Sequence, residues 1–167
     1  REELGDELDL STLESIAGGS LAFVYTVQYR DERIALKARR PGLKSLIERD
    51  LRVVRGLIPL ISVFTDERQQ YSIENAADDF EEIILDELDF AREREIMVEI
   101  RENFADDERV VIPAVYEELS SNRVLAMEYL TGEKVTTDDA FDDVEVDSRE
   151  MATWITKIYL QMGLVDG

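Results

Sequence analysis

Alternating apolar and polar positions are densest near the N-terminal end of the chain. Residues 22–29 and 34–38 are rich in β-branched and aromatic side chains, and a short polar run separates them. This pattern predicts a β-hairpin. After Gly42, apolar residues recur at helical spacing through residues 43–58. They predict a helix with one apolar face, which Pro59 is expected to end or kink.

A long stretch without glycine or proline follows, from Ser72 to Phe104. Its apolar residues keep a helical spacing, but the stretch is longer than most helices of globular proteins, so we expect two helices. The break is expected near Glu87–Leu88–Asp89, where Asp89 is suited to cap the second helix.

The last part of the chain predicts further strands and one more helix. Residues 110–116 and 123–129 are again β-rich and flank a segment of turn composition, which favours a second hairpin. Thr131 to Asp147 is an acidic connection without the spacing of a calcium loop, so we expect a solvated loop. Ser148 is suited to cap a final helix that Gly163 closes. The predicted fold class is therefore α+β.

Composition excludes several kinds of chemistry. The 167 residues include no cysteine and no histidine, which excludes disulfides, thiolate metal sites and histidine-based catalysis. A net charge of −20 argues against binding to nucleic acid. With 39 acidic residues and only four lysines, the composition resembles that of salt-adapted, halophilic archaeal proteins, so the acidity says little about partners. No long uncharged apolar run is present, so we expect a cytoplasmic segment, with any membrane association arising outside it.

A turn of small residues precedes the first predicted hairpin. Between Ile16 and Val24, the residues Ala17, Gly19 and Ala22 take the places of the glycines in a kinase glycine-rich loop. Small residues let backbone N–H groups approach a phosphate, because no side chain stands between them. Taken alone, the same residues fit an ordinary β-turn.

One lysine lies in the middle of the second predicted strand. Strand periodicity puts Ala35 and Lys37 on one face, while Ile34 and Leu36 face a core on the other side. Alanine leaves room for a flat base, and the Lys37 ammonium can extend to phosphates beyond it. A lysine can also protect an edge strand from aggregation. In a chain that uses so few lysines, however, a lysine at a strand centre favours a functional role.

Several stretches together resemble the UbiB family of atypical kinases, also called the aarF-domain kinases, over residues 12–167. The small-residue loop at 15–25, the lysine strand at 34–42 and the Glu-x-Asp stretch at 87–93 carry this resemblance. The family usually shows a run of alanines where this chain has Gly18 and Gly19. Further matches lie at residues 111–116 and 124–132.

The resemblance implies a domain organisation and a role for individual residues. It implies a protein-kinase-like N-lobe at 1–130, with inserted helices, and an acidic linker with the first C-lobe helix at 131–167. Glu93 is then the αC glutamate that pairs with Lys37. Glu87 and Asp89 correspond to a carboxylate pair that faces the active site and holds a regulatory element; a solvated pair is the alternative. The implied nucleotide-binding residues are Ala17, Gly18, Gly19, Ser20, Val24, Ala35, Lys37, the gatekeeper Met127, and Glu128 and Leu130 of the hinge.

The resemblance further implies ATP and Mg²⁺ as cofactors. The magnesium ligands are expected downstream of Gly167, because the catalytic loop and the Asp-Phe-Gly motif do not occur in this sequence. The family's Lys-x-Gly-Gln element is expected upstream. We therefore expect the ATP-binding part of an atypical kinase or ATPase linked to isoprenoid-quinone synthesis, with lipid or quinone-pathway proteins as further partners. A pseudokinase module that binds nucleotide, lipid or protein, and an acidic structural scaffold, are the alternatives.

Overall fold

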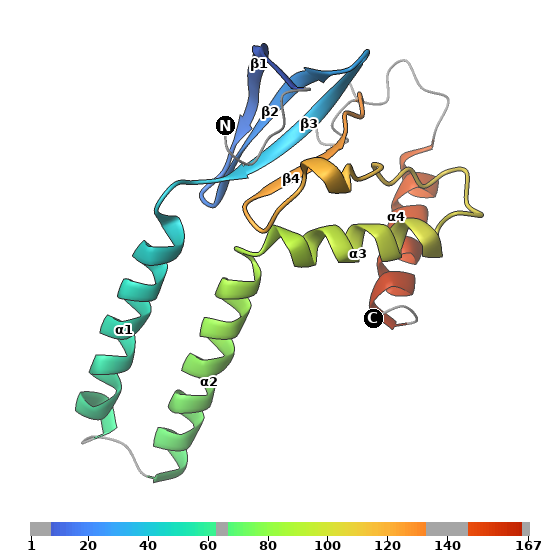
Figure 1. The fold of residues 1–167 in the computed structure, drawn as a ribbon. Helices are drawn as coiled ribbons and strands as arrows, with labels where there is room; N and C mark the ends of the chain where they lie inside the picture. Colours follow the sequence, from blue (N-terminus) through green and yellow to red (C-terminus); the bar gives the residue numbers. More distant parts are fainter. Residues whose placement is uncertain (1–7, 63–66, 133–146, 165–167) are drawn as a thin grey trace.

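The computed structural model describes residues 8–62, 67–132 and 147–164 (Figure 1). One antiparallel sheet has the strand order β1-β2-β3-β4 and is accompanied by helices, so the predicted α+β class is confirmed. The strands are β1 Leu8–Gly18, β2 Ala22–Tyr29, β3 Glu32–Arg39 and β4 Val124–Glu128. The helices are α1 Leu43–Ser62, α2 Glu67–Asp86, α3 Phe90–Asn103 and α4 Ser148–Leu164, with a 3-10 turn, η1, at Glu117–Leu119.

The first predicted hairpin is present as β2 and β3. The two strands pair without interruption from Ala22 opposite Arg39 to Tyr29 opposite Glu32. The turn is shorter than predicted, because β3 begins at Glu32 and leaves only residues 30–31 between the strands. Arg30 has a φ of 52°, the left-handed conformation that tight hairpin turns use.

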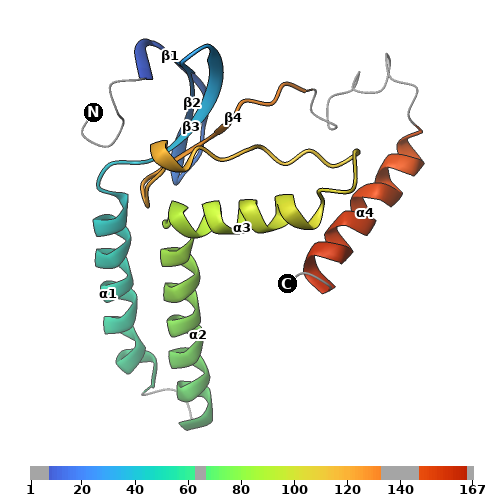
Figure 2. The same cartoon turned by 45° about the vertical axis from the view of Figure 1, so that its right-hand side comes forward.

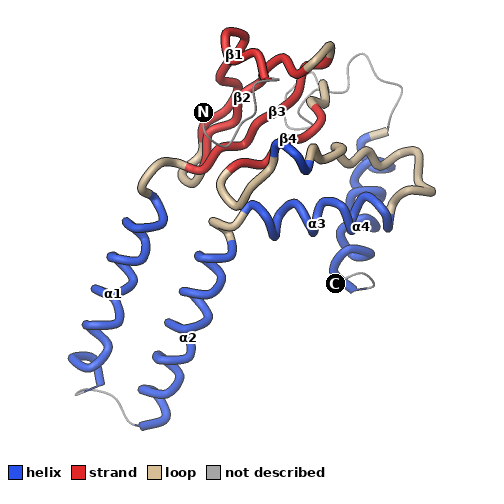
Figure 3. The backbone as a smooth tube through the Cα atoms, in the orientation of Figure 1, coloured by secondary structure: helices blue, strands red, loops and turns tan. Residues whose placement is uncertain are grey.

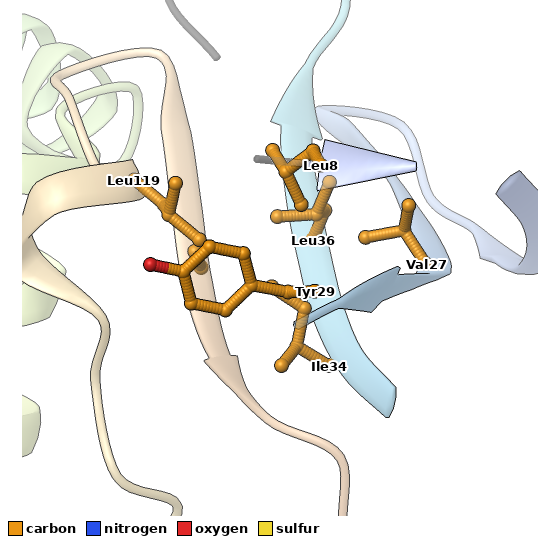
Figure 4. Packing of buried hydrophobic residues seen from close by; sticks show 7 residues of the cluster. Leu8, Val27, Tyr29, Ile34, Leu36 and Leu119 are labelled. Carbon is orange, nitrogen blue, oxygen red and sulfur yellow. The ribbon is translucent and has the colours of Figure 1, made fainter. Parts of the chain in front are cut away.

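The main core lies on one face of this sheet (Figure 4). Ile34 and Leu36 of β3 are buried there, as strand periodicity predicts, because alternate side chains of a strand point to opposite faces. The ring of Tyr116 packs edge-on against Tyr29 with centroids 5.7 Å apart. Other buried members of the cluster are Leu8, Val27, Leu119 and Ala126.

Tyr116 also connects this core to the end of the β2–β3 hairpin. Its hydroxyl donates a hydrogen bond of 2.8 Å to the Glu32 carboxylate. Burial, followed by that hydrogen bond, raises the pKa of Tyr116 to about 12. A tyrosine hydroxyl is protonated at neutral pH even at its ordinary pKa, and the raised pKa keeps this one a donor in alkaline solution as well.

Helices α1 and α2 form an antiparallel pair that projects away from the sheet (Figures 1 and 2). Arg55 of α1 joins the two helices by ion pairs to Asp78 and Glu81 of α2. Of the two expectations for Pro59, that it ends α1 is wrong, because the helix continues to Ser62, and that it kinks the helix stays a prediction. A proline removes its own backbone donor, but the residues after it can still donate to carbonyls one turn earlier.

The predicted break between α2 and α3 is confirmed. Helix α2 ends at Asp86 and α3 begins at Phe90. The Asp89 carboxylate accepts a hydrogen bond of 3.0 Å from the Ala91 N–H, so Asp89 is the N-cap that the sequence predicts. Leu88 and Phe90, on either side of the cap, are each only 1% exposed and anchor the start of α3.

The second predicted hairpin is wrong in its first strand. Residues 110–116 form no strand, and only Val115 makes an isolated bridge, to Met127. Pro113 has no N–H to offer to a ladder. The Ala114 N–H donates instead to the Glu128 side chain at 3.1 Å. Only β4 therefore joins the sheet, by pairing with β3.

The last helix, α4, begins and ends one residue away from the predicted positions. Asp147, not Ser148, supplies the cap, because its carboxylate accepts a hydrogen bond of 2.8 Å from the Arg149 N–H. Gly163 does not close the helix, which runs to Leu164. Figure 3 shows α3 and α4 as separate helices. Arg109, in the segment after α3, contacts α4, since its guanidinium carbon lies 3.2 Å from the Trp154 ring centroid.

The predicted acidic loop and the question of a membrane-spanning helix remain. Most of the predicted acidic loop, residues 133–146, lies outside the described residues. Among the helices that the structure describes, none combines the length and the apolar character needed to cross a bilayer.

Candidate functional site

Lys37 and Glu93 form an ion pair between the sheet and α3. The Lys37 Nζ donates to both carboxylate oxygens of Glu93, at 2.7 and 2.6 Å. The two side chains are 27% and 37% exposed, so the pair is partly shielded but open to a ligand. Glu93 also lies in the first turn of α3, where the helix dipole favours a carboxylate. The predicted contact between these residues is therefore present.

Phe90 lies beneath the ion pair. Its ring centroid is 4.6 Å from the Lys37 Nζ, so the ring face attracts the ammonium. Phe90 is buried in a second cluster with Ala22 and Leu125, on the face of the sheet that carries Lys37. The aromatic ring thus fixes the start of α3 and one side of the Lys37 ammonium at the same time.

Two hydrogen bonds to the backbone at the start of α3 fix its position relative to β3 and β4. The Arg39 guanidinium donates a hydrogen bond of 2.7 Å to the Leu88 carbonyl, just before the N-cap. The Phe90 N–H donates to the Asn122 carbonyl at 3.3 Å. Glu93 follows Phe90 by about one helical turn, so these contacts determine where its carboxylate meets Lys37.

The sheet face around Lys37 contains small and apolar residues. Val24 pairs with Lys37 in the β2–β3 ladder, and Met127 pairs with Ala35 in the β3–β4 ladder. Because directly paired residues of antiparallel strands point to the same side, these four side chains share one face. Val24, Ala35 and Met127 thus lie on the same side of the sheet as the Lys37 ammonium.

The turn between β1 and β2 lies at the end of the sheet that Lys37 approaches. Ala17 and Gly18 are the last residues of β1, and Gly19 and Ser20 lie in the turn. The Gly19 N–H donates to the Ala22 carbonyl at 2.8 Å. The small-residue segment is therefore a tight β-turn that joins two paired strands.

Four further predicted site residues make no hydrogen bond or ion pair with Lys37 in the described part of the chain: Glu87, Asp89, Glu128 and Leu130. Asp89 is occupied as a helix cap, and the Glu87 side chain makes no hydrogen bond to the part of the chain that the structure describes. Glu128 lines a groove of about 780 Å³ between α3 and residues 104–115, which does not include Lys37. Leu130 follows β4 and is 39% exposed. Regulatory and hinge roles for these residues stay predictions.

The described residues provide no metal site of their own. Within residues 8–62, 67–132 and 147–164, no three acidic side chains come close enough together to hold a metal ion.

A family model matches almost the whole of this chain. The model of the ABC1 atypical kinase-like domain matches residues 5–167. The chain belongs to this ABC1 family. The resemblance to UbiB kinases that the sequence motifs carry is thereby confirmed, and so is the kinase-like character of the fold.

Individual relatives of this ABC1 domain are similar over most of its length. The chloroplastic protein ACTIVITY OF BC1 COMPLEX KINASE 1 of Arabidopsis thaliana is 37% identical over 152 residues, which are 87% of this chain and 22% of that protein. An uncharacterized Synechocystis protein is 29% identical over 177 residues, 99% of this chain and 43% of that protein. A probable protein kinase UbiB of Vibrio vulnificus is 29% identical over 126 residues, 74% of this chain and 23% of that protein. The chain thus spans less than half the length of these relatives.

Three residues of the ABC1 site were missed in the sequence analysis: Phe90, Arg39 and Arg40. Phe90 stands between Asp89 and Ala91, and its burial becomes visible only when α3 docks on the sheet. Arg39 and Arg40 lie two and three residues after Lys37, and that proximity is the one signal in the sequence that points to them.

Proposed function

We propose that this ABC1 domain binds an adenine nucleotide, with Lys37 as the residue that contacts its phosphates. The observation that carries the proposal is the two-point contact of Lys37 with Glu93, at 2.7 and 2.6 Å. It places a cation on the sheet face that also carries Val24, Ala35 and Met127. A lysine paired with a carboxylate on the adjoining helix is the arrangement that protein kinases use to hold the α- and β-phosphates.

The donors at the site fit a nucleotide. An ammonium group and the backbone N–H groups of a glycine turn are hydrogen-bond donors, which match the acceptor oxygens of phosphate. Ala35, Val24 and Met127 offer an apolar surface, which suits a flat base. When bound, Mg–ATP supplies the phosphoryl group for transfer, while the residues present here bind and orient it.

We further propose that the whole protein transfers a phosphoryl group or hydrolyses ATP. This proposal rests on family membership and on relatives named as probable protein kinases. The metal ligands and the catalytic base belong to the remainder of the protein. The link to isoprenoid-quinone synthesis rests on the resemblance to the UbiB family.

Calorimetric titration of the full-length protein with Mg–ATP tests the proposed function. We expect saturable binding that depends on the phosphates, so adenosine binds more weakly than ATP. At a concentration 100 times the dissociation constant, ATP should raise the free energy of unfolding by about 2.7 kcal/mol, since it binds only the folded state. Absence of heat and of any shift in melting temperature at millimolar ATP would refute the proposal.

A further inference from the structure

Arg40, the residue after β3, holds both sides of the turn between β1 and β2. Its backbone N–H donates a hydrogen bond of 3.0 Å to the Leu21 carbonyl. Its side-chain Nε donates a hydrogen bond of 2.9 Å to the Gly19 carbonyl. One residue thus fixes the positions of two carbonyls in this turn, those of Gly19 and Leu21.

The Arg40 side chain approaches the turn from the face opposite Lys37. Its guanidinium carbon lies 4.0 Å from the centroid of the Phe23 ring. Phe23 pairs with Ala38, whereas the next residue, Val24, pairs with Lys37. Because neighbouring strand residues point to opposite faces, Phe23 and the guanidinium above it lie on the side away from Lys37.

The hydrogen bond to Gly19 determines the direction of the next N–H group. A trans peptide is planar, and its N–H points opposite to its C=O. Since the Gly19 carbonyl points to Arg40, the Ser20 N–H points away from Arg40, toward the side of the sheet that carries Lys37. Within the described part of the chain, the Ser20 N–H donates to no other residue. It is therefore available to an acceptor on that side.

We propose that Arg40 is a positioning residue for nucleotide binding. It orients the Gly19–Ser20 peptide so that the Ser20 N–H is presented to a phosphate oxygen near Lys37. Glycine turns have many accessible conformations, and fixing one of them before binding lowers the entropy cost of binding. The inference rests on the proposed function, because it assumes that a phosphate group is bound at this turn.

Three variants of the full-length protein test the role of Arg40. Arg40→Ala removes the side-chain hydrogen bond and the contact with Phe23. Arg40→Lys keeps the charge and is the milder change, but it cannot both stack a planar group on Phe23 and donate from Nε. Arg52→Ala removes one exposed positive charge from α1 and serves as the matched control.

Two measurements separate positioning from other effects. Calorimetric titration with Mg–ATP and with adenosine reports whether the loss concerns the phosphates. We expect Arg40→Ala and Arg40→Lys to bind ATP about tenfold more weakly, because the turn must then be ordered on binding, and to bind adenosine as the wild type does. Hydrogen–deuterium exchange of the peptide spanning Gly18 to Phe23, without ligand, should become faster in both variants. Arg52→Ala should match the wild type throughout.

Distinct results would overturn the inference. Equal losses of ATP and adenosine affinity would mean that Arg40 only supports the fold. Wild-type ATP affinity in Arg40→Lys would mean that its charge alone matters. Wild-type ATP affinity in Arg40→Ala would remove the inference and leave the proposed function standing. Failure of the wild type to bind either ligand would remove both.

Discussion

Replacing Lys37 with alanine is expected to weaken Mg–ATP binding, or to lower kcat/KM for ATP, by about 100-fold in the full-length protein. A hundredfold loss corresponds to about 2.8 kcal/mol, which is within the range for a charged hydrogen bond to a phosphate. The fold should persist, because Glu93 is 37% exposed and water can solvate its carboxylate when Lys37 is removed. Calorimetric titration and a thermal melt of the same preparation measure both effects.

Lys44→Ala is the matched control for this prediction. Lys44 lies in the first turn of α1, is exposed and carries the same charge. Its removal should leave ATP affinity unchanged. If Lys37→Ala and Lys44→Ala bind ATP equally well, Lys37 has no phosphate-contacting role, and a structural or lipid-binding function becomes the better hypothesis.

Replacing Phe90 with alanine should cost about 3–5 kcal/mol of folding stability, the range for truncating a buried aromatic residue. The ring is 1% exposed and fills the space between Ala22 and Leu125. Its removal leaves a cavity at the start of α3 and takes away the surface that supports the Lys37 ammonium. Urea unfolding of the full-length protein measures the change.

Phe80→Ala provides the same chemical change at an exposed position. Phe80 lies on α2 with 55% of its surface exposed, so its truncation should cost less than about 1 kcal/mol. Equal costs for the two variants would show that α3 does not dock on the sheet through Phe90.

Apolar periodicity and helix-capping rules predict those elements whose boundaries depend on nearby residues. Alternation of apolar residues predicts β2 and β3, because one face of each strand is buried against the core. Asp89 is predicted as a cap because it lies where a long helical stretch is expected to break. The first backbone N–H groups of the second helix need an acceptor at that point. That Ala35 and Lys37 lie on one face of the strand follows from strand periodicity alone. The pairing of Lys37 with Glu93 follows from the family resemblance.

Features that depend on distant contacts were not predictable from local sequence. Residues 110–116 have strand composition, yet they form no strand, and only Val115 makes an isolated bridge to β4. The hydrogen bond from Arg39 to Leu88 spans 49 positions, and the bond from Arg40 to Gly19 spans 21 positions. Periodicity carries no information about contacts of such separation, which arise only when α3 and the β1–β2 turn meet the end of β3.

Affinity labelling tests most directly the central claim that Lys37 marks the phosphate end of a nucleotide site. This chain has four lysines: Lys37, Lys44, Lys134 and Lys157. An ATP derivative with an acyl group on its terminal phosphate transfers that group to an amine that lies close to the bound phosphates. Mass spectrometry of the digested full-length protein then identifies the acylated lysine. We predict that Lys37 is labelled and that excess ATP suppresses its labelling, whereas the other three react slowly and without protection. Labelling spread evenly over the four lysines and unaffected by ATP would contradict the assignment.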